Sequence, residues 1–212
     1  MLVRDIQPGS SGSSLSDFTV AGGTLYFRAF DDFNGDRLWK SDGTAAGTVL
    51  AGSSGFSPLS LTVVGGTLYF TVAGDRGEEL WNSNNTVAGA VRVFGTGTAE
   101  SSPRFPYFSL TAVGDTLYFT ASHVTYGREL WKSDAANPGI ALFVKDITPG
   151  FSGDDEFRNL TAVGNMLYFS ADNGVDGGEL WKSDGTDAGT VMVKDINPNF
   201  EAGSNPVPLN AN

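Results

Sequence analysis

The segment Asp32-Phe33-Asn34-Gly35-Asp36 holds the strongest candidates for metal chemistry in this sequence. Asp32, Asn34 and Asp36 place oxygen atoms at alternate positions around a glycine, and this pattern suits a calcium loop. Arg37 follows directly, and no acid lies at the distance where a bidentate ligand is expected. Because Asn and Asp in loops also cap backbone amides, a metal-free turn is the alternative interpretation.

Two Ser-Asp-Gly-Thr segments, 41–44 and 183–186, present Asp42 and Asp184 where a sugar hydroxyl could bind. We favour the interpretation that these carboxylates form hydrogen bonds within their own turns. The chain also has four tryptophans that could stack on sugar rings: Trp39, Trp81, Trp131 and Trp181. Their fixed place in a repeat favours packing instead, with one indole between each pair of neighbouring blades.

Catalytic chemistry has little support in this sequence. His123 is the only histidine, cysteine is absent, and no Gly-x-Ser-x-Gly elbow occurs. Multi-histidine zinc sites, thiol catalysis and disulfides are therefore excluded. The paired carboxylates Asp31-Asp32 and Asp154-Asp155 are adjacent in sequence and should point apart, which makes a poor acid/base pair. We expect no enzymatic activity, with a glycan-processing enzyme as the weaker alternative.

A repeat positions these candidate residues. The tripeptide Leu-Tyr-Phe begins at residues 25, 68, 117 and 167, at spacings of 43, 49 and 50 residues. Such periods are typical of propellers and arrays. The last repeat is interpreted as four strands, at 160–163, 166–171, 179–183 and 190–196, with Gly-Asn and Asp-Gly in its turns. Three consecutive apolar residues suit a strand that is covered on both faces, as in a blade between two others.

The sequence therefore predicts an all-β fold, in the form of a β-propeller of four four-stranded blades. The repeats span about 17–51, 59–94, 108–147 and 159–196. We regard a closed four-bladed ring as the leading form, and a segment of a larger propeller or an open β-repeat array as the alternative. Residues 1–200 are expected to form a single domain, and residues 201–212 a flexible C-terminal tail.

The motif in the third strand resembles a known repeat family. Residues 179–186 read Glu-Leu-Trp-Lys-Ser-Asp-Gly-Thr, and residues 37–44 match except that Arg37 replaces the glutamate. Residues 79–86 and 129–136 keep the Glu-Leu-Trp and lose the Asp-Gly-Thr. Over nearly its whole length the chain resembles the bacterial ELWxxDGT (hyalin-like) repeat proteins. This resemblance implies a propeller-like unit of large secreted or surface proteins, without a particular activity or ligand.

Composition narrows the class of partner. The net charge is −11 and the isoelectric point is about 4.3, so we expect neither nucleic acid nor an anionic membrane surface as a partner. No apolar run is long enough to insert in a membrane, and residues 1–4 lead into a strand pattern rather than a signal peptide. Guided by the resemblance, we expect an extracellular or cell-surface location. The expected function is a non-catalytic module for adhesion, glycan binding or structural self-assembly, and the alternative is a calcium-dependent binding module.

The segment Val3-Arg4-Asp5-Ile6 resembles the ends of the third and fourth repeats, Val144 to Ile147 and Val193 to Ile196. It is therefore expected to form a seventeenth strand that a closed ring cannot accommodate. An unpaired strand is a template for another chain. We accordingly expect a homo-oligomer or a filament formed by strand addition as one outcome.

Overall fold

The computed structural model describes residues 2–51, 57–74, 77–83, 90–94, 108–123, 125–134, 136–149, 157–196 and 198. These residues form sixteen strands in four antiparallel sheets, each of which has its strands in chain order. The predicted all-β class is confirmed. The described part of the chain contains no helix that is long and apolar enough to cross a membrane.

Each sheet is one blade. The strands of blade 1 are β1 (Ser16–Ala21), β2 (Thr24–Asp31), β3 (Gly35–Ser41) and β4 (Val49–Leu50). Those of blade 2 are β5 (Pro58–Val64), β6 (Thr67–Gly74), β7 (Gly77–Asn82) and β8 (Val91–Phe94). Those of blade 3 are β9 (Leu110–Val113), β10 (Thr116–His123), β11 (Gly127–Asp134) and β12 (Leu142–Lys145). Those of blade 4 are β13 (Arg158–Val163), β14 (Met166–Asp172), β15 (Gly178–Ser183) and β16 (Val191–Lys194).

The hairpin between the first and second strands is tight because its first turn residue is a glycine in the left-handed region. Gly22, Gly65, Gly114 and Gly164 have φ between 53° and 61°. The register is then the same in every blade and sets the phenylalanine of Leu-Tyr-Phe opposite the tryptophan. The partners are Phe27 and Trp39 in blade 1, and Phe169 and Trp181 in blade 4.

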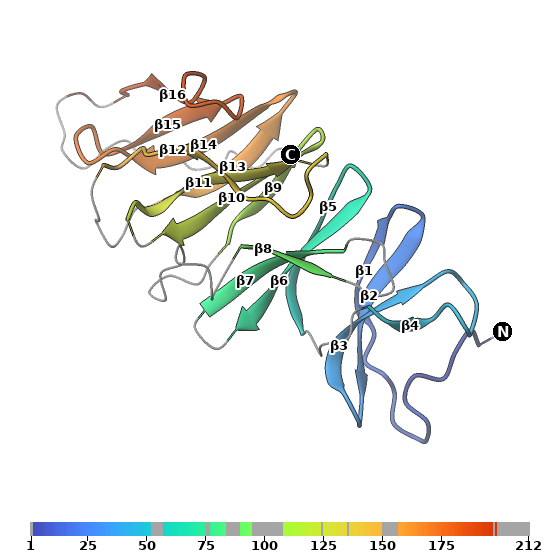
Figure 1. Ribbon diagram of the computed structural model, residues 1–212. Coiled ribbons are helices and arrows are strands. Elements are labelled where there is room, and N and C mark those ends of the chain that lie inside the picture. Colours follow the sequence, from blue (N-terminus) through green and yellow to red (C-terminus); the bar gives the residue numbers. More distant parts are fainter. Residues whose placement is uncertain are drawn as a thin grey trace.

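The blades follow one another in an open row, with blade 1 and blade 4 at its opposite ends (Figure 1). Neighbouring blades approach through their first strands, since β1 lies beside β5, β5 beside β9, and β9 beside β13. This is how propeller blades meet around an axis. Of the two predicted forms, the open row corresponds to a segment of a larger propeller or an open array rather than to a closed four-bladed ring.

The Leu-Tyr-Phe strands are buried on both faces, and each face contacts a different neighbour. We call the side of a blade toward the preceding blade its front face and the opposite side its back face. Tyr26 on the back face of blade 1 lies in one apolar cluster with Leu68 and Phe70 on the front face of blade 2. Tyr69 and Tyr118 have the same role in the next two junctions. The core of the molecule is therefore three junctions between blades.

The expected seventeenth strand at Val3 to Ile6 is wrong. Residues 2–15 contain no strand, and β1 begins at Ser16. Residues 3–7 instead lie across the front face of blade 1, where Arg4 donates to the Thr48 carbonyl at 2.7 Å. Ile6 packs against the cluster of Phe27, Ala29 and Trp39. The comparable segment in blade 3 leaves its sheet after Lys145, so this motif is the end of a strand followed by a linker. The tail at 201–212 lies outside the described residues.

Candidate functional site

The Ser-Asp-Gly-Thr turns close on themselves. In blade 4, Asp184 Oδ1 accepts from the Thr186 amide at 2.9 Å and from its hydroxyl at 2.7 Å. The Thr186 hydroxyl oxygen accepts from the Gly189 amide at 2.9 Å, and Thr190 Oγ1 donates to the Thr186 carbonyl at 2.6 Å. Asp42 and Thr44 form the same bonds in blade 1. In each of the two turns, one carboxylate oxygen of the aspartate therefore accepts hydrogen bonds from the turn itself.

Two glycines are required by this arrangement. Gly185 has φ +87°, which favours glycine, and a Cβ at Gly189 would overlap the Asp184 carboxylate. The hydrogen bonds from Thr186 hold the pKa of Asp184 below its ordinary value of 3.8, and those from Thr44 do the same for Asp42. Both carboxylates thus remain charged as hydrogen-bond acceptors, which is a structural role.

The tryptophans lie on the front faces. Trp131 and Trp181 are buried in junctions, and their Nε1 atoms donate to the carbonyls of Ala121 (3.2 Å) and Ala171 (3.1 Å). Trp81 is partly buried and donates to Glu79 at 3.1 Å. Trp39 is buried beneath residues 3–7 with the Arg4 guanidinium 5.8 Å from its ring, and its Nε1 has no acceptor among the described residues. None of the four indoles is an exposed stacking platform.

The glutamate of Glu-Leu-Trp has a role that the sequence reasoning missed. Glu129 is fully buried on the front face of blade 3, and its two oxygens accept from the backbone amides of Ile147 (3.0 Å) and Thr148 (3.1 Å). Those amides belong to the linker that leaves blade 3 for blade 4, and Ile147 enters the core of that junction. In blade 4, Glu179 accepts from the Ile196 amide at 3.2 Å. The signal was present, because an acid two residues from a buried tryptophan in a strand shares its buried face and needs donors.

The predicted calcium ligands lie in one loop but have separate partners. Asp32 accepts from the Gln7 side chain, Asp36 pairs with Arg28, and the Asn34 amide donates to Asp31 at 2.8 and 2.9 Å. The residue at the centre of the loop is Asp31, which accepts from the amides of Phe33 and Asn34. Burial raises the pKa of the Asp31 carboxyl, but these hydrogen bonds outweigh burial and hold the pKa below its usual range. This geometry is that of an amide-capping turn, and calcium binding at this loop stays a prediction.

No catalytic arrangement is formed by the described residues. His123 is buried and stacks on Tyr126, with 4.8 Å between ring centroids, and lies 5.8 Å from the Trp131 ring. No group of three or more His, Asp or Glu side chains in the described part of the chain could hold a metal ion. The pair Asp154-Asp155 lies outside the described residues. The polar side chains described above form hydrogen bonds that stabilise turns, linkers and junctions between blades.

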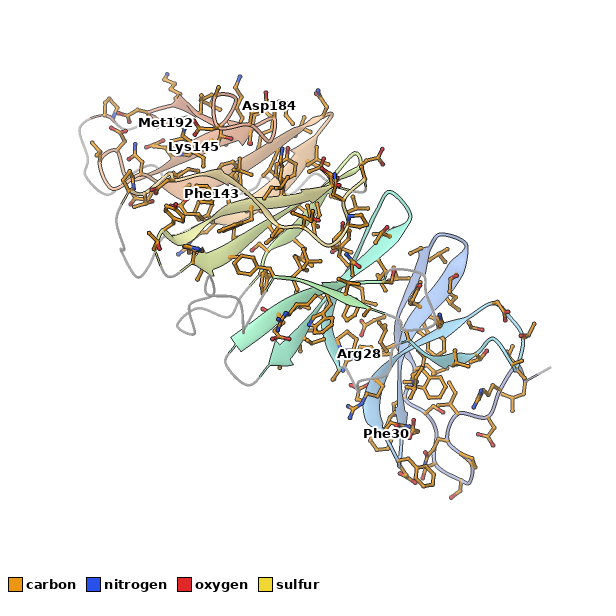
Figure 2. All side chains as sticks on the ribbon, in the orientation of Figure 1. Arg28, Phe30, Phe143, Lys145, Asp184 and Met192 are labelled. Atoms are coloured by element: carbon orange, nitrogen blue, oxygen red, sulfur yellow. The ribbon has the colours of Figure 1, made fainter. Side chains whose placement is uncertain are left out.

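Two lysines connect the turn of blade 4 to blade 3. Lys132 on the back face of blade 3 donates to the Gly185 carbonyl of blade 4 at 2.7 Å. Lys145, which ends β12, donates to the Asp187 carbonyl at 3.1 Å and pairs with its carboxylate at 3.0 Å. Figure 2 labels Lys145, at the end of β12, and Asp184, in the turn after β15, at the blade 4 end of the row. Polar contacts therefore fix the register of one blade on the next.

The front face of blade 1 has no preceding blade in the described structure, and it carries a groove of about 530 Å³. The groove is apolar along one side and polar at the Asp42 turn. Its apolar residues include Leu15, Phe18, Val20 and Leu25, of which the first three are exposed. An exposed apolar surface of this kind is typical of an interaction site.

Comparison with known proteins bears on the fold. No family model matches the chain, and no curated protein matches it. Among solved structures, a puromycin-hydrolysing peptidase from Mycobacterium tuberculosis is 10% identical with a TM-score of 0.51, over 93% of this chain and 30% of that one. A puromycin hydrolase complexed with PGG is 13% identical, with a TM-score of 0.49 over 89% and 30%. TolB from Acinetobacter baumannii is 14% identical, with a TM-score of 0.42 over 84% and 41%.

The chain has a β-propeller fold. It spans about a third of the length of the two hydrolases, and its identity to them is too low to carry any activity across. The comparison supports the fold that the sheet topology shows, and it gives no information about the chemistry of this propeller segment. Its functional surfaces must be inferred from its own residues.

Proposed function

We propose that this chain is a non-catalytic β-propeller module whose role is structural assembly through protein–protein contact. The observation that carries the proposal is the apolar groove on the front face of blade 1, at the open end of the row. Each of the three internal junctions covers the corresponding face of the next blade. The front face of blade 1 is built like these and is covered only in part, by residues 3–7, so it is expected to bind protein surface.

The repeat motif supports this role. Its glutamates hold linkers, its aspartates hold turns, and its tryptophans fill junctions, so the recurring polar residues serve the architecture. An extracellular or cell-surface location is part of the proposal and rests on the likeness to ELWxxDGT repeat proteins. The negative net charge of −11 favours a soluble scaffold that binds protein rather than nucleic acid.

Sedimentation of the purified chain over a wide concentration range tests the proposal. Reversible association that grows with concentration is expected. It should persist at high salt, because burial of apolar surface is screened far less than contact between charges. A chain that stays monomeric throughout would contradict the assembly role. Full hydrolytic activity on a peptide or glycan panel would contradict the non-catalytic one.

A further inference from the structure

The two ends of the row have the surfaces that meet inside it. In every junction, a tyrosine and a leucine on the back face of one blade contact a leucine and a phenylalanine on the front face of the next. Blade 4 carries this set on its back face as Tyr168 and Leu180, and blade 1 carries its partner set on its front face as Leu25 and Phe27. The ends of the row therefore have matching residue types.

The back face of blade 4 is open where the other back faces are closed. Val163 is 56% exposed, whereas its counterpart Val64 in blade 2 is 1% exposed. Ile196 is 52% exposed, whereas Ile147 at the same place after blade 3 is 3% exposed. The difference lies in the following blade, because it is this blade that covers those residues in the internal junctions.

The front face of blade 1 is open at the same points. In blade 4, Gly185 is buried beneath Tyr118, and its carbonyl accepts from Lys132 of the preceding blade. In blade 1 the equivalent Gly43 is exposed and lines the groove. The Ser-Asp-Gly-Thr turn is internally complete in both blades, so Gly43 already has the conformation that its counterpart has in the junction.

The missing lysine and tyrosine are present at the other end of the row. Lys182 and Tyr168 face each other across β14 and β15, as Lys132 and Tyr118 do across β10 and β11. The Lys132 ammonium group also helps to lower the pKa of Asp184, after the larger effect of the Thr186 hydrogen bonds. Asp42, in the groove of blade 1, offers the same charge to a lysine.

We propose that the front face of blade 1 binds the back face of blade 4 of a second copy of this chain. Lys182 of the second copy donates to the Gly43 carbonyl, and its Tyr168 covers the turn beside Ser41. This inference rests on the proposed assembly function and names its partner. If the same contact forms at both ends of the row, two rows of four blades close into a ring of eight blades. This number is within the usual range for propellers, and the ring leaves no exposed end.

One segment opposes the contact. Arg4 and Ile6 take the place on blade 1 that Lys145 and Ile147 take on blade 4, because Arg4 reaches the Ala45 carbonyl as Lys145 reaches that of Asp187. Residues 194–196 of the second copy therefore meet a place that is already filled. Removal of residues 1–8 should strengthen association through the faces, whereas strand addition through those residues predicts its loss.

Sedimentation equilibrium of the full chain and its variants tests the contact. We expect a dimer of twice the 22.3 kDa chain mass. Val163→Asp on the back face and Val20→Asp on the front face should each weaken association by at least about tenfold, because each buries a charge in an apolar junction. Val175→Asp, at an exposed hairpin tip, is the matched control and should leave association unchanged. All three positions are exposed in the single chain, so thermal melting should show intact folds.

A mixture of the two blocked variants decides the head-to-tail geometry. The Val163→Asp chain keeps an intact front face and the Val20→Asp chain keeps an intact back face, so mixing should restore a species of two chains. Adding Lys182→Glu to the Val20→Asp chain should weaken that species. Oligomers larger than two chains that are weakened by the same variants also support the contact, which then forms an open filament instead of a ring. If neither Val163→Asp nor Val20→Asp weakens association, this inference is wrong and the proposed assembly function is unaffected. A monomeric chain overturns both.

Discussion

Removal of the buried Glu129 carboxylate should loosen the junction between blades 3 and 4. The two hydrogen bonds from Ile147 and Thr148 have a charged acceptor, and each such bond contributes about 1.5–3 kcal/mol. Glu129→Ala leaves both amides without their acceptor in the core, so we expect a loss of about 3–6 kcal/mol in the free energy of unfolding. Glu129→Gln keeps one acceptor oxygen and should cost about half as much.

The same substitution can be made in other blades. Glu179 accepts from the Ile196 linker amide, so Glu179→Ala should cost at least about 1.5–3 kcal/mol. Glu79 is buried, accepts from the Trp81 indole at 3.1 Å and lies 3.5 Å from Arg92, so Glu79→Ala should destabilise the protein as well.

Urea unfolding measures the free energies, and amide hydrogen exchange at Ile147 and Thr148 reports the junction directly. Faster exchange at these two amides, with little change in blade 1, is the expected pattern in Glu129→Ala. An unchanged free energy of unfolding in Glu129→Ala, or unchanged exchange at Ile147 and Thr148, would refute the role assigned to this carboxylate.

Four further outcomes can be checked by melting or titration. Trp181→Ala should cost about 3–5 kcal/mol, as for other aromatic residues removed from cores, and an unchanged melting temperature would contradict its packing role. Gly189→Ala should cost about 1–3 kcal/mol by overlap with Asp184, and the double variant with Asp184→Ala should recover part of that loss. Because the folded-state pKa of Asp31 is lowered, its stabilisation is present at neutral pH and is lost as pH falls below about 3.8, so Asp31→Asn should destabilise at pH 7 and converge with the parent in acid. Calcium should produce neither heat nor a higher melting temperature at millimolar concentration, and stabilisation that disappears in Asp36→Asn would support the metal prediction at this loop.

The blades were predictable because their signals are local. Leu-Tyr-Phe, the glycine turns and the Asp-Gly pairs each specify a strand or a hairpin from adjacent residues. Residues 3–6 were misassigned for a physical reason. Their pattern equals that of residues 144–147, but a strand requires a neighbour to complete its ladder, and β12 ends at Lys145 because the next residues turn to the following blade.

Properties of pairs of blades were not predictable from the repeat. Whether the row closes depends on the angle between blades, which is set by side-chain volumes on both sides of a junction. The bond from Lys132 to Gly185 joins residues 53 apart in sequence, and nothing local marks it. The metal prediction relied on the spacing of Asp32, Asn34 and Asp36 alone, and spacing does not show that Arg28 and Gln7 bind two of these side chains.

The hydrogen bonds between Glu129 and the linker amides have a mechanical consequence. Where Glu129 binds the amides after blade 3, a pull along the chain must break two charge-assisted bonds before the next blade can peel away. Blade 1 has Arg37 at that position, a cation that cannot accept an amide proton. Under tension the row should therefore yield after blade 1 before it yields after blade 3, so that one repeat sequence produces joints of unequal strength.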